Sequence, residues 1–281
     1  MENYILSNGL EIPKIGFGTW KLKNNEDTVE IIKNAVLCGY RHFDTAYAYG
    51  NEEMIGKGLQ ESGIPRKKLF VSSKLWNDDR GYDNIINACK RSIENLKCEY
   101  LDMYLIHWPA SKAVHDDWID INNETWKAFE YLYKKGLVKA IGVCNFKKNQ
   151  LIELNKKATI LPMVNQIEYH IGMRQEATIN YCFDNNIVVE AWSPLGSGKM
   201  LKNEEIQNMA KKYNISPAQL CIKWCLQNNV LPLPKSKNVE RMKENLNISD
   251  IDISDEDMKI LNEMPYIGGS GLDSEEIILF G

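Results

Sequence analysis

The chain has 281 residues, of which 44% are hydrophobic and 26% are charged, and its 34 basic against 38 acidic side chains give a formal net charge of −4. This ordinary composition excludes a collagen-like chain, a disordered chain and a small disulfide-stapled scaffold. A net negative charge without a basic block also argues against nucleic-acid binding, so we expect small-molecule partners.

The predicted elements begin with a β-hairpin. Residues 4–12 hold two apolar runs around Asn8-Gly9, a dipeptide typical of hairpin turns. Eight short β-branched or aromatic runs then recur along the chain, each too short for a helix and apolar on both faces, which is typical of parallel strands. These predicted strands cover residues 15–19, 42–45, 70–74, 103–107, 140–143, 163–167, 187–192 and 230–233.

Segments with a helical period separate the predicted strands. Residues 27–37 carry one apolar stripe, and residues 85–96 carry a second stripe formed by Ile86, Cys89, Ile93 and Leu96. The expected helix ends coincide with glycines, and one helix start has a serine cap followed by proline. These signals are Gly39, Gly63, Gly136 and Ser216-Pro217.

The alternation of strands and helices predicts the fold class. Eight strand-helix units at roughly 30 residues each account for about 240 residues, which nearly fills the chain. We therefore predict an α/β protein, a single (β/α)8 TIM barrel in which residues 1–281 form one domain and the N-terminal β-hairpin closes the bottom. Gly16-Phe17-Gly18 lacks the third glycine of a dinucleotide fingerprint, so no doubly wound domain is expected.

Several other site classes are not expected. No apolar run approaches the roughly 18 residues of a membrane span, and the first residues lack the regions of a signal peptide, so we expect a cytoplasmic protein without a membrane partner. Seven scattered cysteines contain no Cys-x-x-Cys pair, and four histidines show no metal-ligand spacing, so no metal is predicted. We interpret Cys221 and Cys225, one helical turn apart, as buried apolar filler in a reduced compartment.

Polar residues gather where the predicted strands end, which is where barrel active sites lie. Asp44 and Tyr49 follow the second strand, Lys74 the third and His107 the fourth. A tyrosine, whose pKa is about 10, needs help to transfer protons near neutral pH. We expect Lys74 to lower the pKa of Tyr49, Asp44 to hold Lys74, and His107 to orient a substrate oxygen. Later strand ends carry Asn145, Gln166, Glu168 and Trp192.

Three motifs carry a family resemblance that extends from end to end. Residues 39–46 with 49–52, residues 101–109, and Pro234-Lys235-Ser236 with Arg241 and Glu244-Asn245 make the chain resemble the aldo-keto reductases, of the bacterial diketogluconate, glyoxal and aldehyde reductase type. The resemblance implies a catalytic tetrad of Asp44, Tyr49, Lys74 and His107. It further implies reduction of aldehydes or ketones by NADPH, with Tyr49 as proton donor.

The same resemblance implies cofactor contacts. Asn145 and Gln166 match positions that bind the nicotinamide carboxamide, and Trp192 matches the ring on which the nicotinamide stacks. Glu190 lies inside a strand and is not carried over. The loop after the seventh strand is expected along the pyrophosphate, and the segment after the eighth at the 2′-phosphate and adenine. The residues are Ser193, Leu195 and Gly196 in the first segment, and Lys235, Ser236, Asn238, Arg241, Glu244 and Asn245 in the second.

Aromatic residues after the strand ends are expected to line the substrate pocket. They are Trp20, Tyr47, Trp76 and Trp108, with Trp118 in a nearby loop as a further candidate. The tail 265–281 either covers the barrel mouth or is a loose end. Two departures from the family pattern stand out. Cys144 replaces a serine with a weakly donating thiol, and residues 197–204 form a short loop, from which we expect easy cofactor release.

Two alternative functions remain at this level. Glu168 and Glu190 could serve as the carboxylate pair of a barrel glycosidase. Alternatively, the chain could be a cofactor-binding regulatory or scaffold barrel with little turnover, against which the intact tetrad argues. The leading hypothesis is an NADPH-dependent reductase of aldehydes, ketoaldehydes or keto sugars that acts as a monomer.

Overall fold

The computed structural model describes residues 3–276 and begins with the predicted hairpin. Strands β1 (Asn3–Ile5) and β2 (Glu11–Pro13) pair antiparallel, and Gly9 takes the turn at φ 83°. Leu6 and Ile12 are buried in the core. The Asn8 side chain donates to the carbonyl oxygen of Lys139, just before a barrel strand begins. The hairpin therefore lies against the N-terminal end of the barrel.

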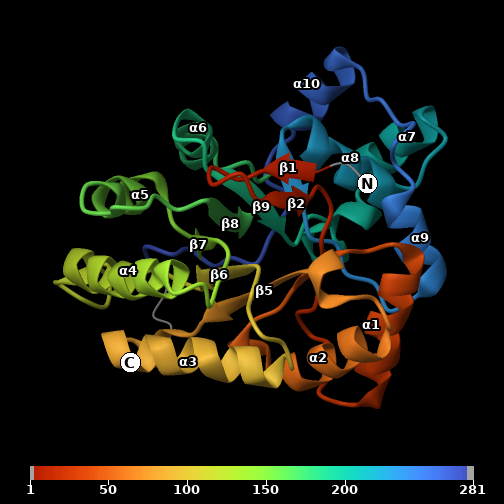
Figure 1. Cartoon of the computed structure of the whole chain (residues 1–281). Coiled ribbons are helices and arrows are strands. Elements are labelled where there is room, and N and C mark those ends of the chain that lie inside the picture. The colour runs from red at the N-terminus through yellow and green to blue at the C-terminus, as the bar shows by residue number, and fades with distance from the viewer. Residues whose placement is uncertain (1–2, 277–281) are drawn as a thin grey trace.

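Eight parallel strands follow in chain order, at the eight predicted places (Figure 1). Almost all of their residues are buried, which explains the apolar character of both faces in the sequence. The strands are β3 (Phe17–Gly18), β4 (His42–Asp44), β5 (Phe70–Leu75), β6 (Met103–Ile106), β7 (Ile141–Cys144), β8 (Val164–Glu168), β9 (Val188–Trp192) and β10 (Val230–Pro232).

Two backbone hydrogen bonds close the sheet between its first and last strands. The N–H groups of Gly16 and Gly18 donate to the carbonyl oxygens of Pro232 and Pro234, each at 3.1 Å. Both bonds run in one direction because the prolines have no N–H to donate in return. A Cβ on Gly18 would lie 2.9 Å from the Leu233 carbonyl oxygen, so this seam requires glycine. The fold is the predicted (β/α)8 barrel.

Helices surround the strands (Figure 1). Gly39 ends the first helix at φ 114°, and Ser216 caps α8 with a capping box, both as predicted. The helices are α1 (Glu26–Cys38), α2 (Glu52–Glu61), α3 (Tyr82–Asn95), α4 (Trp118–Lys134), α5 (Lys148–Asn155), α6 (Glu176–Asp184), α7 (Glu204–Lys212), α8 (Pro217–Gln227), α9 (Val239–Leu246) and α10 (Asp255–Glu263). None of those described is long and apolar enough to cross a membrane.

Two details of the helices differ from expectation. The buried face of α3 is formed by Ile85, Ala88, Cys89 and Ser92, about one position away from the predicted stripe, and Ile86 is only partly buried. The helix also begins three residues earlier than predicted, at Tyr82. Trp118 is the first residue of α4 and does not lie in the preceding loop. Cys221 and Cys225 are fully buried in the core as predicted.

Residues 265–276 are not a loose end: they are fastened at the C-terminal ends of β7, β8 and β9, which is the first alternative for this side of the barrel mouth. The Ser270 N–H donates to Glu168 at the end of β8, at 2.8 Å. Lys147, after β7, pairs with Asp273. Lys199, after β9, donates to the Gly269 carbonyl oxygen at 2.9 Å. The tail is thus fastened to three successive strand-end loops. Residues 277–281 of the predicted tail lie outside the described residues.

Candidate functional site

A buried ion pair stands at the ends of two neighbouring strands. The Lys74 ammonium donates to Asp44 Oδ2 at 2.7 Å and to the Thr45 carbonyl oxygen at 2.9 Å. Lys74 is 0% exposed and Asp44 is 3% exposed. Ser72 lies two residues before Lys74, hence on the same face of β5, and donates to Asp44 Oδ1 at 2.9 Å. Asp44 is therefore held by two polar residues on one face of the adjacent strand, Ser72 and Lys74.

Tyr49 and His107 complete the cluster that the sequence predicts. Tyr49 is the last residue of a short 3-10 turn, Tyr47–Tyr49, that follows β4. Its hydroxyl group lies 3.4 Å from the Lys74 nitrogen. His107 follows β6, and its ring meets the Tyr49 ring edge to face, with centroids 5.6 Å apart. The structure thus brings together all four residues of the tetrad.

The protonation states of the tetrad follow from burial and charge. Burial alone would lower the pKa of Lys74, but Asp44 and Tyr49 raise that pKa above its ordinary value, so the ammonium stays charged. Burial and the charge of Lys74 lower the pKa of His107 well below its ordinary value, so the imidazole is neutral. At neutral pH the site therefore combines a fixed cation with a neutral ring.

Lys74 acts to lower the pKa of Tyr49, as expected, but the pKa of Tyr49 is raised overall. Burial raises the pKa of Tyr49 to about 12, and the nearby Lys74 only partly opposes this rise. The predicted lowering by Lys74 is present, but desolvation of the tyrosinate outweighs the attraction of one ammonium, so the net shift of the Tyr49 pKa is upward. Tyr49 keeps its proton at neutral pH and is available as a proton donor.

The amide side chains predicted at the cofactor lie beside the tetrad. Asn145, directly after β7 and at φ 64°, donates to the His107 carbonyl oxygen at 3.0 Å. Its Oδ1 accepts from the Trp192 indole N–H at 2.8 Å. Trp192 is only half-buried, so its ring is partly accessible. Asn145 therefore links the end of β6 to the end of β9.

The Gln166 amide reaches across the barrel. Its Nε2 donates to Asp44 Oδ1 at 3.0 Å and to Glu190 Oε2 at 2.8 Å. Within the described residues, the sole donor to its Oε1 is the Cys144 thiol, at 3.8 Å. A thiol is a weak donor, so Oε1 remains an available acceptor.

The contacts of Ser72 and Glu190 with this site were missed in the sequence. Their positions carried a signal that could have found them. Each lies two residues before a residue chosen for the site, Lys74 or Trp192, and alternation along a strand places such pairs on one face.

The loop after β9 has the short, small-residue character expected at a pyrophosphate. Ser193 and Ser197 lie at φ 55° and 54°, and the Ser197 N–H donates to Ser193 Oγ at 3.0 Å. A Cβ on Gly196 would lie 2.6 Å from the Met200 methyl carbon. Leu195 directly precedes this turn, and α7 begins at Glu204. The loop is held by its own contacts.

The segment after β10 is a cation cluster at a helix start. Asn238 caps α9 by accepting the Arg241 N–H at 3.0 Å, and Ser236 Oγ accepts the Asn238 N–H at 3.0 Å. Burial, followed by the charges of Lys237 and Lys21, lowers the pKa of Lys235. Among the described residues, the charged groups that shift the Lys235 pKa are both lysines, and Arg241 nearby is exposed. The cluster is suited to a phosphate group.

The last two predicted cofactor residues lie within α9 itself. Glu244 is half-buried, and its carbonyl oxygen accepts from Gln219 at 3.3 Å. Asn245 is 3% exposed and acts to lower the pKa of Tyr40, whose hydroxyl group donates to the Met242 carbonyl oxygen at 3.4 Å. Glu240, whose negative charge would repel a phosphate, pairs with Lys243 at 3.0 Å, which offsets part of that charge.

The predicted substrate aromatics differ in exposure. Trp20 is 49% and Tyr47 is 37% exposed, whereas Trp108 is 6% exposed. Trp76 meets the His107 ring edge to face, with centroids 5.2 Å apart. Trp76 is thus in direct contact with the tetrad, and Trp20 and Tyr47 form the outer part of the same rim.

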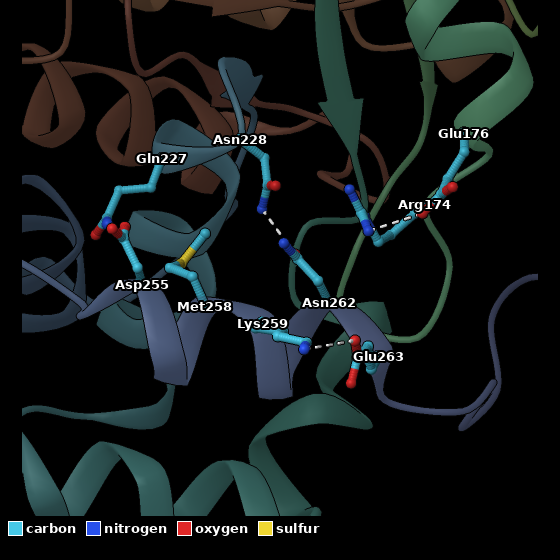
Figure 2. A pocket seen from close by; sticks show the side chains of 9 residues that line it. All are labelled: Arg174, Glu176, Gln227, Asn228, Asp255, Met258, Lys259, Asn262 and Glu263. Carbon is cyan, nitrogen blue, oxygen red and sulfur yellow. Dashed lines mark hydrogen bonds and ion pairs between the residues drawn. The ribbon is translucent and has the colours of Figure 1, made fainter.

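A separate cavity of about 730 Å³ lies away from the tetrad, on the outside of the barrel. Figure 2 shows that its walls come from α8, α10 and the start of α6. Its nine lining residues are Arg174, Glu176, Gln227, Asn228, Asp255, Met258, Lys259, Asn262 and Glu263. No residue of the predicted site belongs to it. Residues 3–276 contain no group of three acidic, histidine or cysteine side chains that could hold a metal ion.

Comparison with known proteins gives consistent matches. The model of the aldo/keto reductase family matches residues 14–265. The 9,11-endoperoxide prostaglandin H2 reductase of Trypanosoma cruzi is 44% identical over 270 residues, which cover 94% of this chain and 93% of that protein. The glyoxal reductase of Bacillus subtilis is 42% identical over 273 residues, with 97% and 96% covered. A solved structure of a Gox0644 mutant in complex with NADPH has a TM-score of 0.90 at 38% identity and covers 98% of both chains.

The ion pair yields a stability prediction. Replacing Lys74 by methionine should lower the free energy of unfolding by about 3 to 5 kcal/mol, because a buried Asp44 then has no counter-charge. The double variant Lys74→Met with Asp44→Asn should recover much of this loss, since it buries no unpaired charge. Denaturant unfolding of the three proteins checks the prediction. A single variant as stable as the parent would contradict it.

Proposed function

The chain belongs to the aldo/keto reductase family and is an NADPH-dependent carbonyl reductase, and we propose that Asp44, Tyr49, Lys74 and His107 are its catalytic residues. The observation that carries this proposal is the position of the Lys74 ammonium, which contacts Asp44 at 2.7 Å and Tyr49 at 3.4 Å. The overall reaction converts a carbonyl compound, NADPH and a proton into an alcohol and NADP⁺.

Each residue of the tetrad has a distinct task. Tyr49 donates its hydroxyl proton to the carbonyl oxygen as negative charge develops there. Lys74 stabilises the tyrosinate that remains, and Asp44 fixes the ammonium in place. His107, being neutral, orients the carbonyl oxygen by a hydrogen bond toward the Tyr49 hydroxyl. A proton from solvent later restores Tyr49.

The residues around the tetrad fit NADPH. When bound, NADPH supplies the hydride that reduces the carbonyl carbon. Gln166 offers a free amide oxygen to the carboxamide, beside Asn145, and the partly accessible Trp192 offers a ring face to the nicotinamide. Backbone N–H groups of the loop containing Ser193, Leu195 and Gly196 would hold the pyrophosphate. The cation cluster would hold the 2′-phosphate through Lys235, Ser236, Asn238 and Arg241, with Glu244 and Asn245 toward the adenine.

We propose small aldehydes and α-dicarbonyl compounds as substrates. The similarity to a glyoxal reductase supports this class, as does the rim of Trp20, Tyr47, Trp76 and Trp108. Neither carboxylate that the glycosidase alternative requires is accessible to a substrate. Glu190 is 0% exposed, and both Glu168 oxygens accept hydrogen bonds from Ser270.

Three further properties are part of the proposal. We propose that residues 1–281 act as one domain, because a continuous buried core extends from Leu6 to Met264. We also propose that the protein works as a monomer. Its cytoplasmic location stays a prediction from the sequence.

Changing Tyr49 to phenylalanine tests the function directly. The variant should lose about 10²- to 10⁴-fold in kcat for carbonyl reduction, since general acid catalysis contributes this much. NADPH affinity should stay within a few-fold of the parent. The rate is followed by NADPH absorbance with methylglyoxal, aromatic aldehydes and keto sugars, and affinity by fluorescence quenching. A rate within a few-fold of the parent would assign the proton to another group.

Changing Trp76 to alanine should reorder the substrates. We expect kcat/KM ratios between aromatic and aliphatic aldehydes to change by about tenfold, because specificity is a ratio of transition-state affinities. NADPH affinity should not change. The control is Tyr82→Ala, which removes an exposed aromatic ring at the start of α3. A uniform loss across the aldehyde panel would instead assign Trp76 a packing role.

Changing Arg241 to alanine tests the cofactor phosphate site. The parent should prefer NADPH over NADH by roughly 10²-fold, because two charge-assisted hydrogen bonds to a phosphate, screened by solvent, have about this effect. The variant should lose about tenfold in NADPH affinity and little in NADH affinity. Lys259→Ala, which removes a lysine from α10 outside the cation cluster, is the control. Equal affinities of the parent for both cofactors would remove the basis of the assignment.

A further inference from the structure

A carboxyl group that the proposed mechanism does not use lies beneath the tetrad. Glu190 is in the middle of β9, is 0% exposed, and pairs in register with Gln166 on β8. Trp192, two residues later, shares its face of the strand. Burial of a carboxyl group is costly unless its oxygens are satisfied or it is neutral. Its contacts therefore need an explanation.

The first contact fixes the orientation of the Gln166 side chain. Its Nε2 has two hydrogens, one donated to Asp44 at 3.0 Å and the other to Glu190 at 2.8 Å. Asp44 already accepts from Lys74 and Ser72 and offers only oxygen, so the nitrogen end of the amide must face it. The Gln166 carbonyl oxygen is thereby turned away from both carboxyl groups.

The second contact concerns the other oxygen of Glu190. Oε1 has no hydrogen-bond partner among the described residues and lies 3.6 Å from Nε2 of the fully buried His42. Burial, aided by Asp44, raises the pKa of Glu190 to about 8, and burial lowers the pKa of His42 to about 4. At pH 7 both groups are therefore neutral.

The surroundings of Glu190 contain few other charges. Asp44 and His42 face it from β4, Lys74 from β5 and Cys144 from β7. Gln166 on β8 is uncharged, and β10 supplies Leu231 in register. Lys74 and Asp44 balance each other, and burial raises the pKa of Cys144, so that its thiol is neutral. Ionised Glu190 would thus be an unbalanced negative charge inside the barrel.

We propose that Glu190 is a positioning residue for the reduction: it holds the Gln166 amide so that its oxygen faces the cofactor carboxamide and its nitrogen steadies Asp44. The inference rests on the proposed function of the tetrad. A neutral Glu190 performs this task without opposing Lys74. Loss of its proton would set a second negative charge against the ammonium and would make Tyr49 a weaker acid.

The proposal gives the pH dependence of reduction a specific sign. As pH rises through about 8, Glu190 ionises and kcat falls several-fold. This fall lies far below the pKa of Tyr49, about 12, so titration of the tyrosine does not account for it. Stability follows the same group. Folding raises the pKa of Glu190 from its ordinary value of 4.5 to about 8. The contribution of its proton to the free energy of unfolding is therefore fully present below pH 4.5 and is lost as pH rises to about 8.

Three variants test the role of Glu190. Glu190→Gln keeps the volume and the acceptor oxygen but cannot ionise, so kcat should stay level from pH 7 to 9 and the Kd of NADPH should stay within about threefold of the parent. Glu190→Val removes the acceptor, so the Kd of NADPH should rise about tenfold. Glu52→Gln is the control, because Glu52 is also a buried carboxyl group, bonded to Ser73 and Asn95. This control should keep the pH profile of the parent.

Two outcomes would overturn the proposal. One is a Glu190→Gln variant whose kcat falls through pH 8 like that of the parent. The other is a folded Glu190→Val variant with unchanged NADPH affinity. If Glu190→Val does not fold, thermal melting of Glu190→Gln and of the parent tests the proposal instead. The Tm of Glu190→Gln should depend less on pH between 5 and 8 than the Tm of the parent, and equal dependence would refute the assignment.

The experiment also separates this inference from the proposed function. If the parent reduces no carbonyl compound, the proposed function fails, while NADPH affinity and melting still report on Glu190. If Tyr49→Phe loses activity as expected but the Glu190 variants behave like the parent in every measurement, the tetrad stands and the role of Glu190 is refuted.

Discussion

The ammonium of Lys74, shut away from water, constrains the whole site. A buried cation is stable only if fixed acceptors surround it, and Asp44 Oδ2 and the Thr45 carbonyl oxygen supply them. Both acceptors come from the end of β4, so the β4–β5 register, in which Asp44 lies opposite Ser72, decides whether the cation can exist. Tyr49 on the following turn then lies against a charge whose position the sheet sets.

Closure of the barrel brings residues from distant strands into the site formed by β4 and β5. Gln166 is 122 residues from Asp44 along the chain, yet its amide reaches that carboxylate from the other side of the barrel interior. Only a sheet curled back on itself brings β8 so near β4. The glycines of the seam, Gly16 and Gly18, take part in this geometry because they let the first and last strands approach. Residues remote from the chemistry thus contribute to its precision.

Much of this arrangement could be predicted from the sequence, because parallel strands buried on both faces leave continuous apolar runs and their polar ends converge. Asp44, Lys74 and His107 were found in this way. Strand alternation places Glu190 on the same face as Trp192, but the sequence gives no sign of which side chains hydrogen-bond to that carboxyl group. The raised pKa of Tyr49 was missed because desolvation depends on packing. The path of the tail depends on contacts such as Ser270 with Glu168, which its glycine-rich, acidic composition does not reveal.

The fastening of the tail divides the barrel mouth into two unlike halves. Its described anchors are Glu168 at the end of β8 and Lys147 and Lys199 in the loops after β7 and β9. None belongs to the loops after β3 to β6, where Trp20 and Tyr47 stand exposed. A small alcohol that leaves past these rings does not have to break the three contacts named here. A molecule bound along the β9 loop would lie beside the hydrogen bond between Lys199 and Gly269. Product can therefore leave on the side of Trp20 and Tyr47 while this bond stays intact.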